Sequence, residues 1–187
     1  MAVIAEFSAV EGHVSLLLTA LAKGDPEPVA AIYSVLRQGQ IQAKALSAVA
    51  SQVLDADDVA LLSRLMKVIR TASDDRDALA HRLWFFDRNL PEAVVLADPA
   101  IIWRTDHEVK VGGGTGPTTV EHAERVQGVM RDACVIWRGD DFDVAQKRAA
   151  HASIGLQAFR LMVIAETAAT KAEERQKVLN ILDMASF

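Results

Sequence analysis

The chain has 187 residues, 51% of them hydrophobic and 24% charged, and its 20 basic and 25 acidic side chains give a formal net charge of −5. This length and composition predict a folded chain of one domain and exclude global disorder, and the acidic balance excludes a protein that coats nucleic acid with its whole surface. The one cysteine, Cys134, excludes a disulfide framework and a cysteine-built zinc site. We expect Cys134 to lie buried on a helix.

The first third of the chain has a helical period. Apolar residues recur at steps of three and four over 3–21, which predicts a helix that ends before Gly24. Further helices are expected over about 28–39 and 40–54. No apolar run reaches the roughly 18 residues that a membrane span needs, and no secretory pattern opens the chain. We therefore expect a cytoplasmic protein without a membrane partner.

A fourth helix is predicted to carry an arginine on its apolar stripe. Acidic residues at 55–58 suit its start, and its stripe extends over 62–83 with Arg76 at one of the apolar positions. A guanidinium is costly to bury unless it is paired. Three explanations stay open: the stripe reaches solvent at Arg76, or Arg76 pairs with Asp74, Asp75 or a residue of another helix, or it faces an anionic ligand.

The helical pattern is interrupted around 90–117. Two apolar runs, at 94–96 and 101–103, predict two or three short strands or a hairpin. The glycine-rich segment 112–117 lacks the GK[ST] ending of a phosphate-binding loop, so we expect a flexible turn there. This region is the irregular insertion of an otherwise helical chain.

Helical signals return after the insertion. A capping box at 118–121 predicts a helix that continues through Trp137, and a last helix is predicted over about 143–172 with a break near Gly155. The sequence thus predicts a mostly all-α protein. It is expected to form one helical domain over 1–187, an antiparallel bundle of five or six helices with a β-rich or irregular insertion around 90–117.

Three residues on the fourth helix are candidates for chemistry. His81 follows Arg76 by five residues, and Asp77 lies one turn before His81, where its carboxylate can accept a hydrogen bond from the ring. Together they supply a cation for phosphate, an orienting carboxylate and a proton-transfer group. A straight helix places Arg76 and His81 about 140° apart. A site therefore needs a helix break near 73–75 or the convergence of two chains.

The segment Arg76-Asp77-Ala78-Leu79-Ala80-His81 resembles the R-x4-6-H motif of HEPN domains, which are compact α-helical bundles. The resemblance covers about residues 1–86. It implies a metal-independent endoribonuclease with no cofactor, often a toxin or anti-phage defence effector, whose active site forms at a homodimer seam. It also implies that His81 acts as general base or acid, that Arg76 holds the scissile phosphate, and that Asp77 orients one of them. The product would carry a 2′,3′-cyclic phosphate.

The chain departs from the family pattern at two positions. Many active members carry Asn after the Arg and Gly after the His, where this chain has Asp77 and Arg82. An aspartate beside Arg76 can neutralise it, and inactive members of the family bind only nucleotides or partners. The alternative is therefore a non-catalytic helical interaction or nucleotide-binding module. Expected partners are a second copy of the chain, RNA, and an antitoxin or regulatory protein.

Two further groups of residues bear on function. The aromatic residues at 84–86 either stack on a base or pack the end of the bundle. The histidine-containing clusters at 106–108 and 121–122 lack the paired spacing of metal ligands, so no metal site is expected.

Overall fold

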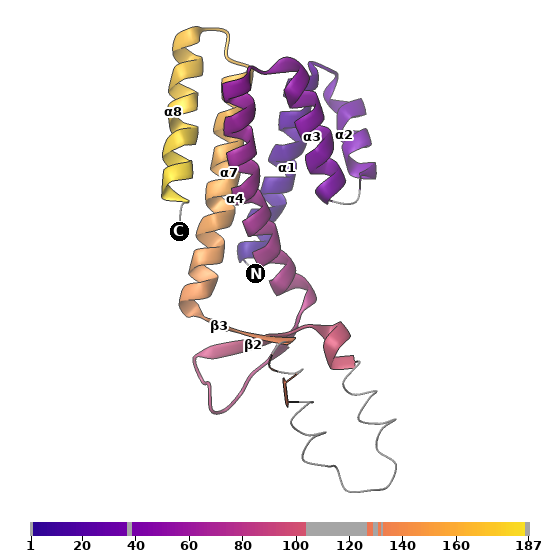
Figure 1. Cartoon of the computed structure of the whole chain (residues 1–187), viewed down its shortest axis with the longest axis vertical. Coiled ribbons are helices and arrows are strands. Elements are labelled where there is room, and N and C mark those ends of the chain that lie inside the picture. The colour runs from indigo at the N-terminus through magenta and orange to yellow at the C-terminus, as the bar shows by residue number, and fades with distance from the viewer. Residues whose placement is uncertain (1, 37–38, 104–126, 129–130, 132, 186–187) are drawn as a thin grey trace, which may run out of the picture. The chain divides into compact units, whose positions relative to one another are not determined.

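The computed structural model describes residues 2–36, 39–103, 127–128, 131 and 133–185. These residues are mostly helical and include a three-stranded antiparallel sheet (Figure 1), so the predicted fold class is confirmed at this level. The chain divides into two compact units, Met1–Asp74 with Ala145–Phe187, and Asp75–Val144. The single domain over 1–187 stays a prediction.

The first unit is built from helices, and its first three lie close to where the sequence predicts them. The helix α2 begins at Pro26 because Asp25 caps it, accepting a hydrogen bond from the Glu27 backbone N–H, and because proline suits a first turn. The helices that contribute to this unit are α1 (Ala2–Ala22), α2 (Pro26–Val35), α3 (Gly39–Val53), α4 (Ala56–His81), α7 (Gly139–Val163) and α8 (Ala168–Met184).

The core of the first unit lies between α1, α3, α4, α7 and α8. The helix α1 turns one apolar stripe into this core, as its three-and-four spacing predicts. Its segment Val3–Ala22 is also long and apolar enough to cross a membrane, a test that the core helix of a globular protein passes as well. The α1 residues that the structure buries are Val3, Phe7, Val10, Val14, Leu17, Leu18 and Leu21.

The prediction of one helix over 143–172 with a break near Gly155 is wrong. Gly155 lies inside α7, and the chain leaves the helix only after Val163. Thr167 then caps α8 by accepting a hydrogen bond from the Thr170 backbone N–H. Gly155 serves packing instead of a break, because a Cβ built on it would lie 2.7 Å from Cδ1 of the buried Leu65.

Replacement of Gly155 by alanine is expected to destabilise the protein. The added methyl would collide with Leu65 in a close-packed core, and overpacking of this kind typically costs about 1–3 kcal/mol. The same change at Gly12, inside α1 and with nothing within 4 Å of its built Cβ, should instead raise stability by about 0.5–1 kcal/mol. Urea unfolding of both variants tests the pair, and equal effects at both sites would contradict it.

The second unit contains the sheet, whose strand order is β1-β2-β3. The strand β1 (Leu83–Phe85) pairs with β2 (Ala93–Ala97), and β2 pairs with β3 (Cys134–Arg138), both antiparallel. The strand predicted at 94–96 is therefore confirmed within β2. The sheet reaches beyond the predicted insertion on both sides, because β1 begins at Leu83 and β3 ends at Arg138.

Two other predictions in this unit are wrong. Residues 101–103 are helical, because Asp98 accepts a hydrogen bond from the Ala100 backbone N–H and starts a helical segment at 99. The helix expected to continue through Trp137 gives way to β3, so Cys134 lies half-buried on a strand. β-Branched and aromatic residues dominate β3, which favours a strand once β2 is available for pairing. The glycine-rich segment 112–117, the capping box at 118–121 and the clusters at 106–108 and 121–122 lie outside the described residues.

Candidate functional site

Arg76 lies on an unbroken helix. The helix α4 continues from Ala56 to His81 without an interruption at 73–75, so the local break that would let one chain form the site is not present. The stripe positions on either side of Arg76, Ala72 and Leu79, are buried. The Arg76 side chain itself is 30% exposed. Its guanidinium therefore sits at the margin of the apolar stripe and does not extend freely into water.

The charge of Arg76 is compensated by the next residue. Its Nη1 donates a hydrogen bond to Oδ1 of Asp77 at 2.6 Å. Pairing was one of the three explanations open for this arginine, and Asp77 is the aspartate that the departure from the HEPN pattern had indicated could neutralise it. A guanidinium has five N–H donors in a planar group, a geometry that suits carboxylate and phosphate oxygens.

His81 is the last residue of α4 and is exposed. The predicted hydrogen bond between Asp77 and His81 is not formed within the described part of the chain, because the Asp77 carboxylate turns to Arg76 instead. The structure thus brings Arg76 and Asp77 together and leaves His81 apart from them. The arrangement offers a paired cation and, five residues later, an accessible imidazole.

Trp84 contacts the end of α4 and the ring of Phe142, which agrees with the explanation that residues 84–86 pack the end of the bundle. Its indole Nε1 donates a hydrogen bond to the Leu79 carbonyl at 3.0 Å, satisfying an acceptor in the last turn of α4. Its ring lies 6.1 Å from that of Phe142, which in turn contacts Trp137 edge-on at 5.2 Å. Trp84 and Phe85 are exposed to the same degree, 44% and 46%, whereas Phe86 is 78% exposed.

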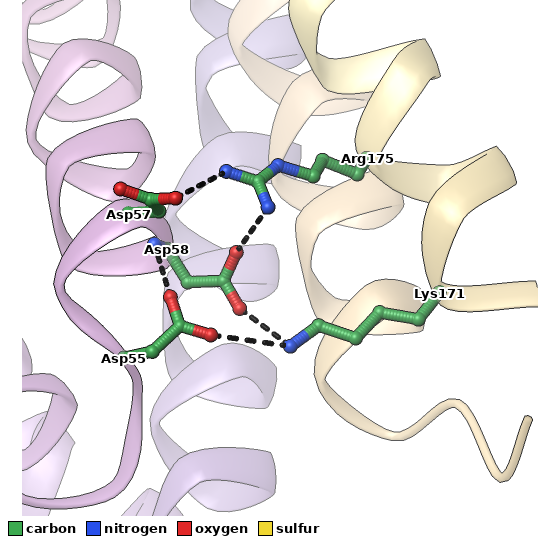
Figure 2. Close-up of polar contacts among 5 residues, drawn as sticks. All are labelled: Asp55, Asp57, Asp58, Lys171 and Arg175. Atoms are coloured by element: carbon green, nitrogen blue, oxygen red, sulfur yellow. Dashed lines mark hydrogen bonds and ion pairs between the residues drawn. The ribbon is translucent and has the colours of Figure 1, made fainter. Parts of the chain in front are cut away.

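A second polar cluster, in the first unit, was not predicted from the sequence (Figure 2). Asp55 caps α4 by accepting a hydrogen bond from the Asp58 backbone N–H at 2.8 Å. The Asp58 side chain is fully buried, with Oδ2 2.6 Å from Lys171 Nζ and Oδ1 3.6 Å from Arg175 Nη1. Figure 2 shows both cations reaching from α8 toward the start of α4, where Arg175 also approaches Asp57.

The charges in this cluster stabilise one another. The hydrogen bond to Asp58 raises the pKa of the Lys171 ammonium, and the hydrogen bond from the Asp58 backbone lowers the pKa of the Asp55 carboxyl. A pocket of about 240 Å³ adjoins Asp58 and Lys171, with Lys23 on its wall. Because Lys171 is already shared between two carboxylates, we assign the cluster a structural role that ties α8 to α4. The i,i+4 spacing of Lys171 and Arg175 places both cations on one face of α8, but the sequence does not identify Asp58 as their partner.

Comparisons of the chain with protein-family models, with curated proteins and with solved structures found no match. The resemblance to HEPN domains therefore stays a prediction. The observations that bear on function are the positions and contacts of Arg76, Asp77 and His81.

Proposed function

We propose that this chain is a HEPN-like, metal-independent endoribonuclease that acts in the cytoplasm as a homodimer. The observation that carries the proposal is the guanidinium of Arg76, held on the margin of an apolar stripe by Asp77, with the exposed imidazole of His81 at the end of the same helix. Arginine is the side chain whose planar guanidinium matches phosphate oxygens, and histidine is the side chain best suited to proton transfer at neutral pH.

The continuity of α4 makes a second copy part of the proposal. Residues five apart on a straight helix point about 140° away from each other, so Arg76 and His81 of one chain do not converge on one phosphate. In the proposed site, Arg76 of one copy acts with His81 of the other. A two-fold dimer would bring the two motifs face to face, because the same surface patch meets itself across the axis.

The proposed reaction uses the RNA's own 2′-hydroxyl as the nucleophile. His81 removes the 2′-hydroxyl proton as the oxygen attacks phosphorus, and the bond from phosphorus to the 5′-oxygen breaks. A protonated imidazole returns a proton to that leaving oxygen. Arg76 stabilises the negative charge that grows on the non-bridging oxygens. The products are a 2′,3′-cyclic phosphate and a 5′-hydroxyl. Because such an enzyme would also damage its own cell's RNA, the proposal includes an antitoxin or regulatory protein as a partner.

Incubation of the purified protein with mixed-sequence RNA in the presence of a metal chelator tests the proposal. We expect cleavage that the chelator does not reduce, with products ending in a 2′,3′-cyclic phosphate and a 5′-hydroxyl. Analysis of the product ends by mass spectrometry is the readout, and His81→Ala is the inactive control. Intact RNA at every pH tested, or cleavage by the His81→Ala protein at the unaltered rate, would contradict it.

The ion pair between Arg76 and Asp77 also favours the alternative, a non-catalytic interaction or nucleotide-binding module. At 2.6 Å the carboxylate compensates the guanidinium without any ligand. On this alternative, Arg76→Ala destabilises the fold and RNA stays intact with every variant. On the nuclease proposal, Arg76→Ala abolishes cleavage and leaves the unfolding transition nearly unchanged, since a partly exposed ion pair contributes about 0–1 kcal/mol.

A further inference from the structure

A groove in the second unit lies along one face of the sheet. It has a volume of about 450 Å³, and β1, β2, β3 and the loop between β1 and β2 contribute to its wall. Side chains of neighbouring strands that face each other in the register share a face, so Phe85, Val95 and Ile136 form one row across the sheet. The residues that line the groove are Phe85, Phe86, Asp87, Arg88, Asn89, Val95 and Cys134.

Packing does not account for two of the aromatic side chains here. Trp84, on the opposite face, is engaged by the Leu79 carbonyl and by Phe142. Phe85 and Phe86 make no ring contact with any residue that the structure describes, and Phe86 is 78% exposed. An exposed ring beside a groove of ligand size is suited to bind a flat ligand, because an aromatic face stacks on any base.

The groove lining also carries one acid, Asp87, and one cation, Arg88. Asp87 closes its own turn, since its Oδ1 accepts a hydrogen bond from the Asn89 backbone N–H at 2.8 Å. Arg88 forms no ion pair with an acid in the described ranges, and neither does Arg138, which does not line the groove but which the register places on the same face as Phe85. Aromatic rings next to unpaired guanidinium groups complement a polyanion with exposed bases better than an apolar protein surface.

We propose that this groove binds single-stranded RNA, with a base stacked on Phe86 and a phosphate held by Arg88. The inference rests on the proposed nuclease function, for which the groove would be a substrate-binding subsite. Phe85 follows His81 by four residues, so their Cα atoms are at most roughly 14 Å apart. A strand bound in the groove could therefore extend to the imidazole.

Binding of a short, mixed-sequence, fluorescently labelled single-stranded RNA to the His81→Ala protein tests the groove without interference from cleavage. Adding Phe86→Ala should weaken binding about tenfold or more, and Phe86→Trp should retain it because a ring remains. Adding Arg88→Ala should weaken binding and make it less sensitive to salt, because one phosphate contact is lost. Val35→Ala is the matched control, since Val35 is 76% exposed on α2 of the other unit, and it should leave binding unchanged.

The outcomes separate this inference from the proposed function. Unchanged affinity in both groove variants, or no RNA binding at all, overturns the inference. If the wild-type chain cleaves RNA and the groove variants bind it unchanged, the groove is refuted as an RNA-binding site and the proposed nuclease function stands. If the groove variants bind RNA more weakly but the wild-type chain cleaves none, RNA binding in the groove is supported and the proposed nuclease function is refuted. Circular dichroism confirms folding, and Phe86→Leu replaces Phe86→Ala if that variant does not fold.

Discussion

Mixing two inactive variants, Arg76→Ala and His81→Ala, is expected to restore RNA cleavage that neither shows alone. Loss of the proton-transfer group should lower the cleavage rate about 10²–10⁴-fold. Loss of the charge-stabilising group should lower it about 10²–10³-fold. In the proposed dimer the continuity of α4 requires a working pair drawn from two copies, so a mixed dimer would keep one intact pair: His81 of the first variant and Arg76 of the second.

The proposed dimer also predicts how much of the wild-type cleavage rate returns. Random assortment makes half of the dimers mixed, and each mixed two-fold dimer retains one of its two pairs, so about a quarter of the wild-type rate should return. Co-expression of differently tagged copies, followed by a cleavage assay, measures it. Arg70→Ala is the control, because Arg70 is exposed on the same helix and should leave the rate unchanged. Recovery of no activity would show that Arg76 and His81 act within one chain.

The long helices could be predicted because their information is local. The apolar stripe of α1 repeats over five turns, and the spacing of α4 placed Arg76 on the stripe, between Ala72 and Leu79, which the structure buries. The existence of the candidate motif and its position on a helix were therefore readable from spacing alone. The sequence indicated Asp77 as an acid able to neutralise the guanidinium but left Asp74 and Asp75 open as well, because a side chain with several rotatable bonds can reach acids in either direction along the helix.

The sheet was harder to predict because its partners are far apart in the chain. Leu83 continues the helical spacing of α4, yet it pairs with Ala97 in the sheet. Trp137 fits the period of a helix equally well, yet it is buried by Phe142 and paired with Val94 on β2. In each case a contact made after the chain folds back overrides the local period.

Asp58 illustrates the same limit for a polar residue. Its position after Asp55 predicts a role at the start of a helix, and Asp55 does cap α4. Its complete burial depends on the docking of α8, which brings Lys171 and Arg175 to the carboxylate. No sequence pattern within a few residues of Asp58 indicates that contact. The contribution of Asp58 to stability can therefore be recognised only once the helices are assembled.

Removal of the Asp58 charge is expected to give the largest loss of stability among the acidic residues of this cluster. Asp58→Asn keeps the shape of the side chain but leaves Lys171 and Arg175 without the buried negative charge that they pair with. Breaking a buried ion pair costs about 3–5 kcal/mol, and because both cations are partly exposed and can be hydrated, about 2–3 kcal/mol is expected here. The free energy of urea unfolding, followed by the helical circular dichroism signal, measures the loss.

The neighbouring Asp57 is the matched control, because it carries the same charge as Asp58 but is not buried. Its side chain is 84% exposed and lies 3.8 Å from Arg175, so Asp57→Asn should change the unfolding free energy by less than about 0.5 kcal/mol. A double-mutant cycle of Asp58→Asn with Lys171→Met should give a coupling energy of about 1–3 kcal/mol, because each single change leaves the other group unpaired. Equal effects of Asp57→Asn and Asp58→Asn, with no coupling, would show that α8 is held by its apolar side chains alone and that the buried carboxylate contributes nothing to its docking.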